Sequence, residues 1–157
     1  MDLIDENNPQ YIGRPGGVGQ RGANFNQQNS DFILVLGARL DHGQIAYEHK
    51  YFAREAIKCI VDIDNNELKK NEMDIKYPVN MDVKVFLNEI NCRINKKLEI
   101  NSWLKYSRRV YEKYPVILKE YLDQNLKHVN NYALIDAISD VVKNDSLLIP
   151  GSSGACS

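Results

Sequence analysis

The segment from Gly13 to Asp64 constrains the fold of this chain more than any other. It holds a glycine-rich turn, Gly13–Gly17, followed by two short apolar runs, Phe32–Leu36 and Lys58–Asp62. Such runs are too short for a helix and are typical of strands buried in a parallel sheet. The first run ends in Gly-Ala-Arg and the second in Asp-Ile-Asp. Both are candidate ligand loops, because open α/β sheets bind ligands where parallel strands end.

The remaining segments extend this α/β pattern. We expect a helix over Val18–Asn29, a surface loop over 42–50, a short helix over Tyr51–Ala56, a turn of helix over Asn65–Lys70 and a third strand over Asp74–Tyr77. Amphipathic spacing predicts helices over Met81–Asn95 with Asn80 as N-cap, over Asn101–Tyr114 and over Asn131–Lys143, before a strand over Ser146–Pro150. The predicted class is α/β, a partial Rossmann-like parallel sheet with helices on both faces, truncated at both ends.

Composition excludes several functional classes. A chain of 157 residues with 43% hydrophobic content can bury one good core, and a net charge of −1 offers no attraction for nucleic acid or an anionic membrane. No apolar run approaches the roughly 20 residues that span a bilayer, and the first residues lack the pattern of a secretory signal. We therefore expect a cytoplasmic protein.

The cysteines and histidines give no metal or disulfide signature. The three cysteines are widely spaced, and Cys59 lies inside an apolar run, where a small buried thiol is expected. The three histidines form no pair at metal-ligand spacing, so no metal site is predicted.

The residues from Gly17 to Gly22 match G-x-G-x-x-G. A dinucleotide site needs a strand directly before this motif and an acidic residue about 20 positions later; Asp41 could serve, but Tyr11-Ile12 is too short for the strand. Two other interpretations stay open. The glycines could allow a helix start to pack closely against the sheet, or their backbone N–H groups could hold a phosphate or flavin edge.

The polar residues at the strand ends also have two interpretations each. Asp62 and Asp64 could accept hydrogen bonds from a ribose, or Asp64 could cap a helix that begins at Asn65. Arg39 could contact a phosphate, or could pair with Asp41 or Asp31.

The blocks GGVGQRGANF, NSDFILVLGARLD and FAREAIKCIVDIDNNELKK, taken in this order, resemble the central domain of thiamine-diphosphate-dependent enzymes, most closely the acetolactate synthase large subunit. The block YALIDAISDVVKNDSLLIPGSSG resembles the start of that family's C-terminal diphosphate-binding domain. The resemblance implies an incomplete central domain over residues 1–126 and an incomplete diphosphate-binding domain over residues 127–157.

Members of this family use thiamine diphosphate and Mg²⁺ to decarboxylate a 2-keto acid such as pyruvate and to join the product to a second carbonyl. The resemblance implies a homodimeric or homotetrameric parent, with a catalytic glutamate in a first domain and a Gly-Asp-Gly metal motif in the third. This chain has no Gly-Asp-Gly sequence and no counterpart of the first domain. We therefore expect no catalytic residue and no metal ligand in it.

The resemblance also places possible cofactor contacts. A nucleotide or FAD would be held by residues matching the flavin-containing members: Gly16, Gly17, Gly19, Gly37, Arg39, Asp62 and Asp64. An incomplete thiamine diphosphate site would include residues of the last loop: Gly151, Ser152 and Ser153. No cofactor is expected to bind tightly to this chain alone.

Three functions follow from the sequence. The first is a fragment of an acetolactate-synthase-type enzyme that is inactive alone. The second is a free-standing nucleotide- or FAD-binding module, and the third is a purely structural central domain.

Overall fold

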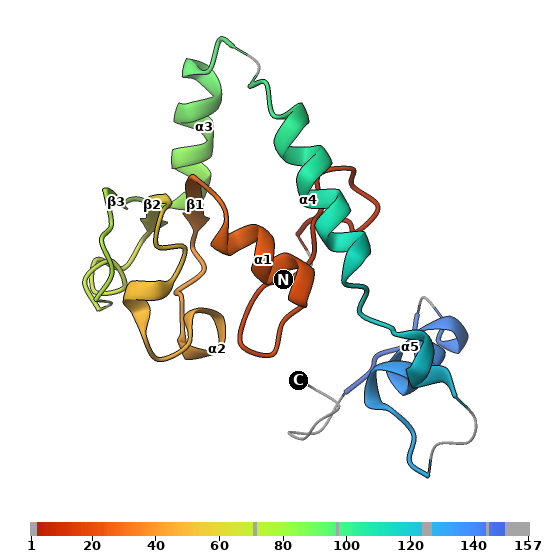
Figure 1. Cartoon of the computed structure of the whole chain (residues 1–157). Coiled ribbons are helices and arrows are strands. Elements are labelled where there is room, and N and C mark those ends of the chain that lie inside the picture. Colours follow the sequence, from red (N-terminus) through yellow and green to blue (C-terminus); the bar gives the residue numbers. More distant parts are fainter. Residues whose placement is uncertain (1–2, 71, 97, 124–126, 144, 150–157) are drawn as a thin grey trace. The chain divides into compact units, whose positions relative to one another are not determined.

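The structure is a computed structural model that describes residues 3–70, 72–96, 98–123, 127–143 and 145–149 (Figure 1). It divides into two compact units, Met1–Lys113 and Tyr114–Ser157. Each unit is described by itself below. The domain boundary expected near residue 126 stays a prediction.

The first unit contains a parallel three-stranded sheet. Its strands are β1 (Phe32–Leu36), β2 (Ile57–Asp62) and β3 (Tyr77–Asn80), in the order β1-β2-β3 (Figure 1). The partial Rossmann-like class is therefore confirmed, as are the first two strands. The third strand begins three residues later than predicted, because the apolar side chains of Met73 and Ile75 pack against the core before the chain joins the sheet.

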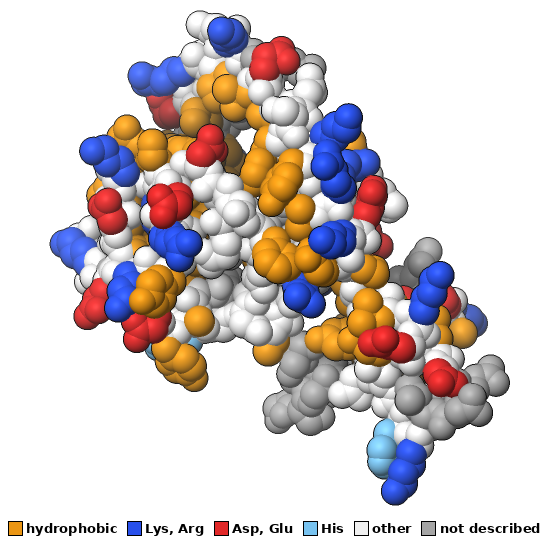
Figure 2. All heavy atoms as spheres, viewed as in Figure 1, with side chains coloured by type: hydrophobic (Ala, Val, Ile, Leu, Met, Phe, Trp, Pro, Cys, Tyr) orange, Lys and Arg blue, Asp and Glu red, His pale blue; other side chains and the backbone are white. Residues whose placement is uncertain are grey.

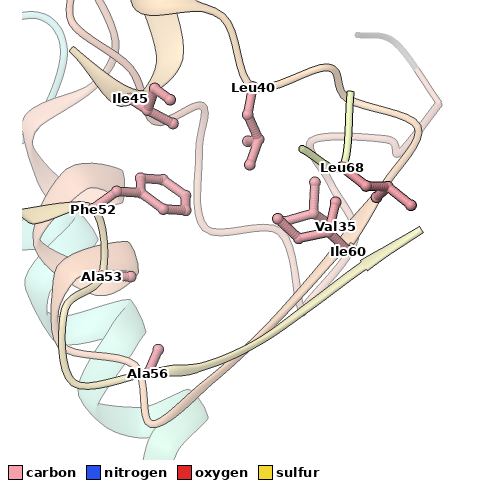
Figure 3. Packing of buried hydrophobic residues seen from close by; sticks show 8 residues of the cluster. All are labelled: Val35, Leu40, Ile45, Phe52, Ala53, Ala56, Ile60 and Leu68. Atoms are coloured by element: carbon pink, nitrogen blue, oxygen red, sulfur yellow. The ribbon is translucent and has the colours of Figure 1, made fainter. Parts of the chain in front are cut away.

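One face of the sheet carries the hydrophobic core. Val35 of β1 lies beside Ile60 of β2 in the strand register, and both side chains are buried. Around them lie the other members of the cluster (Figure 3): Leu40, Ile45, Phe52, Ala53, Ala56 and Leu68. The segment between β1 and β2 thus closes back over this face.

That connecting segment is more regular than predicted. It forms α2 (His42–Ile45) and the 3-10 turn η1 (His49–Tyr51), where a loop was expected. The predicted helix over Tyr51–Ala56 is wrong: the chain turns there and buries Phe52, which is 2% exposed. Elements of three or four residues are too short to show a hydrophobic period, which is why the pattern missed them.

The opposite face of the sheet is partly open. Four side chains that share it by register are 39–52% exposed: Phe32, Leu34, Ile57 and Tyr77. Cys59 and Val61 on the same face are buried. The expectation that these strands are buried on both faces is therefore wrong, because the described helices cover only part of this face.

Two helices distant in sequence pack together in the first unit. These are α1 (Arg21–Gln28) and α4 (Asn101–Lys113), seen side by side in Figure 1. A Cβ on Gly22 would lie 3.0 Å from the Cα of Tyr111, and the Asn26 amide donates to the carbonyl of Ser107 at 3.1 Å. Small and polar side chains therefore bring the two backbones close. The prediction of a helix over 101–114 is confirmed.

The helix after β3, α3 (Val83–Arg93), begins at a cap that the sequence did not identify. Asp82 is the N-cap, and its carboxylate accepts from the backbone N–H groups of Lys84 (2.8 Å) and Val85 (3.2 Å). Asn80, the predicted cap, instead donates its amide to the carbonyls of Asp62 and Ile63. Two capping residues two positions apart could not be separated without knowing where β3 ends.

The second unit contains the 3-10 turn η2 (Lys119–Leu122) and α5 (Asn131–Val141), which is capped by Asn130. The helix predicted from Asn131 is confirmed and ends two residues early. The strand predicted from Ser146 is wrong for residues 146–149, where the structure has no strand; Pro150 lies outside the described residues. A strand requires a neighbour to pair with. No helix within the described ranges of either unit is long and apolar enough to cross a membrane.

Candidate ligand cleft at the carboxyl ends of the strands

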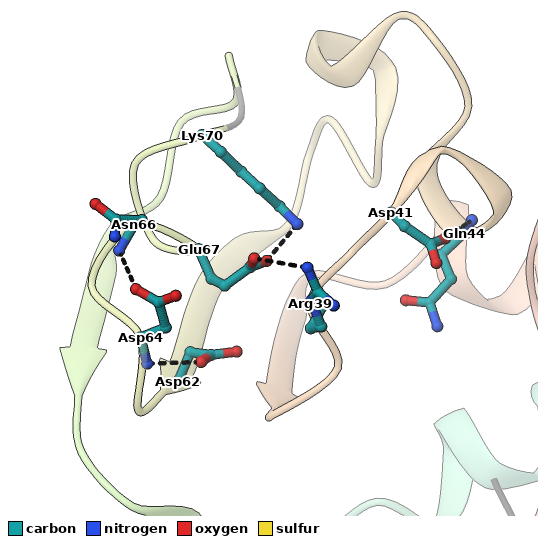
Figure 4. A network of polar contacts seen from close by, with 8 residues as sticks. All are labelled: Arg39, Asp41, Gln44, Asp62, Asp64, Asn66, Glu67 and Lys70. Carbon is teal, nitrogen blue, oxygen red and sulfur yellow. Dashed lines mark hydrogen bonds and ion pairs between the residues drawn. The ribbon is translucent and has the colours of Figure 1, made fainter.

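The carboxyl ends of the strands meet at a cleft of about 530 Å³. It gathers four residues that the sequence singled out, Gly37, Arg39, Asp62 and Asp64. The cleft is completed by Ile63, Glu67, Asp82 and Val83. Figure 4 shows the side chains of Asp62, Asp64, Glu67 and Arg39 grouped beyond the ends of β1 and β2. The strand ends that the sequence singled out therefore border a concavity in the structure.

Gly37 shapes one wall of the cleft. Its φ of +57° lies in the left-handed region that favours glycine, and its N–H donates to the carbonyl of Val61 at 2.8 Å. A Cβ at this position would lie 3.3 Å from Cγ2 of Val83. The glycine thus lets the chain turn off β1 while the start of α3 approaches.

The side chains of Asp62 and Asp64 stabilise two consecutive turns at the end of β2. The Asp62 carboxylate, in a residue only 6% exposed, accepts from the N–H of Asp64 at 2.9 Å. The Asp64 carboxylate accepts from the N–H of Asn66 at 2.8 Å. Asp64 therefore stabilises a turn over residues 65–69 rather than the predicted helical turn.

Arg39 pairs with a residue that the sequence did not suggest. Its guanidinium lies 3.3 Å from Oε1 of Glu67, and Lys70 pairs with the other oxygen of that carboxylate (Figure 4). The sequence suggested Asp31 or Asp41 as its partner, whereas the structure pairs it with Glu67. Asp41 is instead the N-cap of α2 and accepts from the N–H of Gln44 at 3.2 Å.

The two cations change the acidity of Glu67. Its hydrogen bond with Lys70, and that with Arg39, lower the pKa of the Glu67 carboxyl below its usual value, against the opposing effect of burial. Since the carboxylate form is favoured, Glu67 is charged at neutral pH and holds Arg39 at the rim of the cleft. The Arg39 side chain is nevertheless 76% exposed, so its outer nitrogens remain open to solvent.

Asp82 is a cleft residue that the sequence reasoning missed. It follows β3 by two residues, in the same relation that Asp64 has to β2. A search for acidic residues just after each strand would have found it only with the third strand placed at its true position, Tyr77–Asn80. The displaced prediction of β3 hid that signal.

The charge of the cleft determines which ligand groups it can hold. Four carboxylates line it, those of Asp62, Asp64, Glu67 and Asp82, against the single guanidinium of Arg39. Carboxylates accept hydrogen bonds and repel anions. The arrangement therefore suits hydroxyl donors such as those of a ribose better than it suits a phosphate.

The glycine-rich turn does not line this cleft, and the backbone N–H groups of Gly16, Gly17 and Gly19 are already bonded. Gly17 donates to the carbonyl of Gly43 at 2.6 Å, and Gly19 donates to that of Gly16 at 3.1 Å. The Asn24 side chain accepts from the N–H of Gly16 and donates to its carbonyl, each at 2.8 Å. None of these glycines lines the cleft. The structure therefore does not bring Gly16, Gly17 and Gly19 together with Asp62 and Asp64.

The structure favours a packing role for these glycines. No strand precedes the motif within residues 3–16, which confirms the weakness of the dinucleotide interpretation. A Cβ on Gly19 would lie 2.6 Å from the backbone of Arg14, Pro15 and Gly16. The close helix packing at Gly22 is made against α4, whereas the sequence suggested the sheet.

The remaining candidates add no further chemistry. Gly151, Ser152 and Ser153 lie outside the described residues. Cys59 is buried as predicted, and burial raises the pKa of its thiol, so the unreactive form is favoured. Within the described part of the chain, no group of three or more metal-ligating side chains comes together.

Comparison with known proteins agrees with the family resemblance seen in the sequence. Residues 1–90 match the family described as thiamine pyrophosphate enzyme, central domain. The acetolactate synthase large subunit of Cyanidium caldarium is 30% identical over 119 residues, which are 72% of this chain and 20% of that protein. The acetolactate synthase large subunit of Lactococcus lactis subsp. lactis is 29% identical over 140 residues, which are 88% of this chain and 23% of that protein. The chain thus spans about a fifth of the length of the curated relatives it matches.

Proposed function

Because this chain belongs to the thiamine pyrophosphate enzymes, through their central domain, we propose that it is the central part of an acetolactate-synthase-type protein. We further propose that its cleft binds the ribose of a nucleotide such as FAD. One observation carries this second proposal: carboxylates at the ends of two different strands line the same cavity, with Asp62 ending β2, Asp64 following it and Asp82 following β3.

The fit to FAD is partial. The carboxylates suit ribose hydroxyls, but the excess of negative charge disfavours a diphosphate beside them. The glycine turn does not supply the missing anion site, since the N–H groups of Gly17 and Gly19 are bonded within the protein. We therefore propose that the nucleoside end of the ligand enters the cleft and that its phosphates point towards the exposed Arg39.

A ligand titration tests this proposal. Adenosine, ADP and FAD are added separately to the purified chain. The shift in the unfolding temperature is measured for each compound, and titration calorimetry gives each Kd. We expect adenosine to bind at least as tightly as ADP. Asp62→Asn keeps the acceptor oxygen for the Asp64 N–H while removing the charge, and should weaken adenosine binding. No stabilisation by any of the three would reject the nucleotide site.

For the whole protein we propose the activity suggested by its relatives, thiamine-diphosphate- and Mg²⁺-dependent decarboxylation of a 2-keto acid followed by carboligation. Thiamine diphosphate would supply the carbanion that this chemistry requires. No residue described above performs a step of it, and the sequence has no Gly-Asp-Gly metal motif. The chain alone should therefore give no acetolactate from pyruvate, thiamine diphosphate and Mg²⁺. Turnover above background would contradict this.

A structural role is the second candidate, and the packing of the glycines favours it. If the chain only supports neighbouring parts of a larger protein, it should bind none of the three nucleosides or nucleotides. Asp62→Asn would then change stability alone. The same titration thus separates the two candidates.

We also propose a cytoplasmic location and a homodimeric or homotetrameric parent. The location is supported by the cysteines, since Cys59 and Cys92 are both free thiols and disulfides persist mainly in oxidising compartments.

A further inference from the structure

The ion pair between Arg39 and Glu67 differs from other ion pairs of the first unit in how deeply its carboxylate lies. The Glu67 side chain is 13% exposed. The acidic partners in three other pairs are 57–83% exposed: Glu48, Glu55 and Glu89. Acidic and basic side chains lie close together at several places on the face drawn in Figure 2, but exposed pairs contribute little because solvent and salt screen them. A recessed carboxylate is screened less, so Glu67 acts more strongly on its partner.

Backbone hydrogen bonds fix the turn that carries Glu67. The Glu67 N–H donates to the carbonyl of Asp64 at 3.0 Å, and the Lys69 N–H donates to that of Asn66 at 3.1 Å. The next side chain, Leu68, is buried in the hydrophobic core. Because the turn is anchored in this way, the Glu67 carboxylate is a fixed point of negative charge at the rim of the cleft.

The backbone at Arg39 directs its side chain to the same rim. Arg39 has a φ of +57° and Leu40 a φ of +46°, both in the left-handed region that residues with a side chain rarely adopt. Such strain persists only where the surrounding structure holds it. Here Leu40 is buried in the core, while Arg39 lines the cleft and its guanidinium lies 3.3 Å from Oε1 of Glu67. The guanidinium is thus held by Glu67 and exposed elsewhere.

We propose that Glu67 sets the preference of the cleft for nucleosides over nucleotides, because it pairs with the cation that a ligand phosphate would need. This inference rests on the nucleotide site proposed above. Arg39 is the one cation among the described residues that line the cleft. A phosphate that approaches Arg39 must compete with the Glu67 carboxylate and is repelled by it. A neutral nucleoside meets no such repulsion, so the charge of Glu67 discriminates between the two ligands.

The ratio of the adenosine Kd to the ADP Kd, measured by titration calorimetry, tests this role. Glu67→Gln keeps an oxygen that can accept from Arg39 and removes the charge, so ADP should gain about tenfold relative to adenosine at low salt. Added NaCl should reduce this gain, because the effect is electrostatic. Glu89→Gln is the matched control, since Glu89 also pairs with an arginine, Arg93 at 2.8 Å, but does not line the cleft. It should leave the ratio unchanged.

Two further variants show whether Glu67 acts through Arg39. In an Arg39→Gln background, Glu67→Gln should change the ratio much less, because no guanidinium is left to be released. Lys70→Met tests the opposite direction. It removes the cation on the other oxygen of Glu67 and leaves that carboxylate to Arg39, so ADP should lose affinity relative to adenosine. Urea unfolding establishes that each variant is folded.

The outcomes separate this inference from the nucleotide site itself. A higher relative affinity for ADP in Glu67→Gln, but not in Glu89→Gln, would support the role of Glu67. If the parent chain binds adenosine and the ratio is the same in Glu67→Gln, that role is wrong while the site stands. If the parent chain binds neither adenosine nor ADP, the site and the role of Glu67 are both rejected.

Discussion

Two turns of this protein look alike in sequence and differ in structure. The turn over residues 13–19 and the turn over residues 37–40 both combine glycine with an arginine one or two positions later, and both are candidate phosphate loops. In the first, the N–H groups of Gly17 and Gly19 are bonded to nearby carbonyls. The second opens onto a cleft lined by carboxylates.

The difference teaches that a glycine loop is a binding site only if its N–H groups remain available. Gly16 has a φ of +146°, and a Cβ added at this position would lie 2.9 Å from the carbonyl oxygen of Gly43. The first turn therefore needs glycine for its own closure. The second turn needs Gly37 to let α3 approach, and the ligand-facing groups come from side chains at the strand ends.

Gly19→Val should have the largest effect of the predicted changes. It tests whether the first turn is closed, meaning that its backbone packs and bonds against itself and leaves no room for a side chain at Gly19. Its Cβ would lie 2.6 Å from three backbone atoms, which cannot move as a side chain can. We expect a loss of about 3 kcal/mol in the free energy of unfolding. Trp103, the only tryptophan, gives a fluorescence signal for urea unfolding of the first unit.

Gly17→Ala is the control for this change. Its Cβ would meet a single atom, the carbonyl oxygen of Gly43 at 3.3 Å, so the loss should be about 1 kcal/mol or less. Equal losses for the two variants would mean that the turn is not closed in the way described.

Asn24→Ala should have the next largest effect. The Asn24 side chain makes two hydrogen bonds with the backbone of Gly16, and losing both should cost about 2 kcal/mol. Adenosine affinity, measured by calorimetry, should not change, since Asn24 does not line the cleft. A clear fall in affinity with stability intact would make the first turn a binding site after all.

Asp82 variants separate capping from binding in the cleft. Asp82→Ala removes the cap of α3 and should cost about 1 kcal/mol. Asp82→Asn keeps the cap, so its unfolding free energy should be close to that of the parent chain. If the cleft holds a ribose, both variants should weaken adenosine binding, by about fivefold for the asparagine variant. Unchanged affinity in both would exclude Asp82 from the site.

The pH dependence of Glu67 should give the smallest effect. The folded pKa of Glu67 is lowered, so its contribution to stability is present above the unfolded pKa and is lost as pH falls through the folded value. The parent chain should therefore lose more stability than Glu67→Gln as the pH falls from about 5 through the range where carboxyls titrate. Urea unfolding at several pH values measures this.

The ion pair with Lys70 is the proposed cause of that lowered pKa. Lys70→Met should raise the pKa of Glu67, which can be followed by NMR of the side-chain carboxyl. A pKa that does not move would assign the shift to Arg39 alone.

The pattern of apolar runs predicted much of the fold but not its short elements. Phe32–Leu36 and the run ending at Asp62 were found because buried strands are apolar throughout, and α4 and α5 because their apolar residues recur at helical spacing. The four residues of α2 show no such period. The strand predicted from Ser146 failed because pairing depends on a neighbour, which composition cannot supply.

The sequence by itself determined the family, the parallel strands and the placing of Asp62 and Asp64 at a strand end. Those follow from local hydrophobicity and from the order of the motifs. Only the tertiary structure decided that Arg39 pairs with Glu67, that Asp82 joins the cleft and that the glycine turn is closed by Gly43. These contacts join residues far apart in the chain, and their geometry depends on how the segments between them fold.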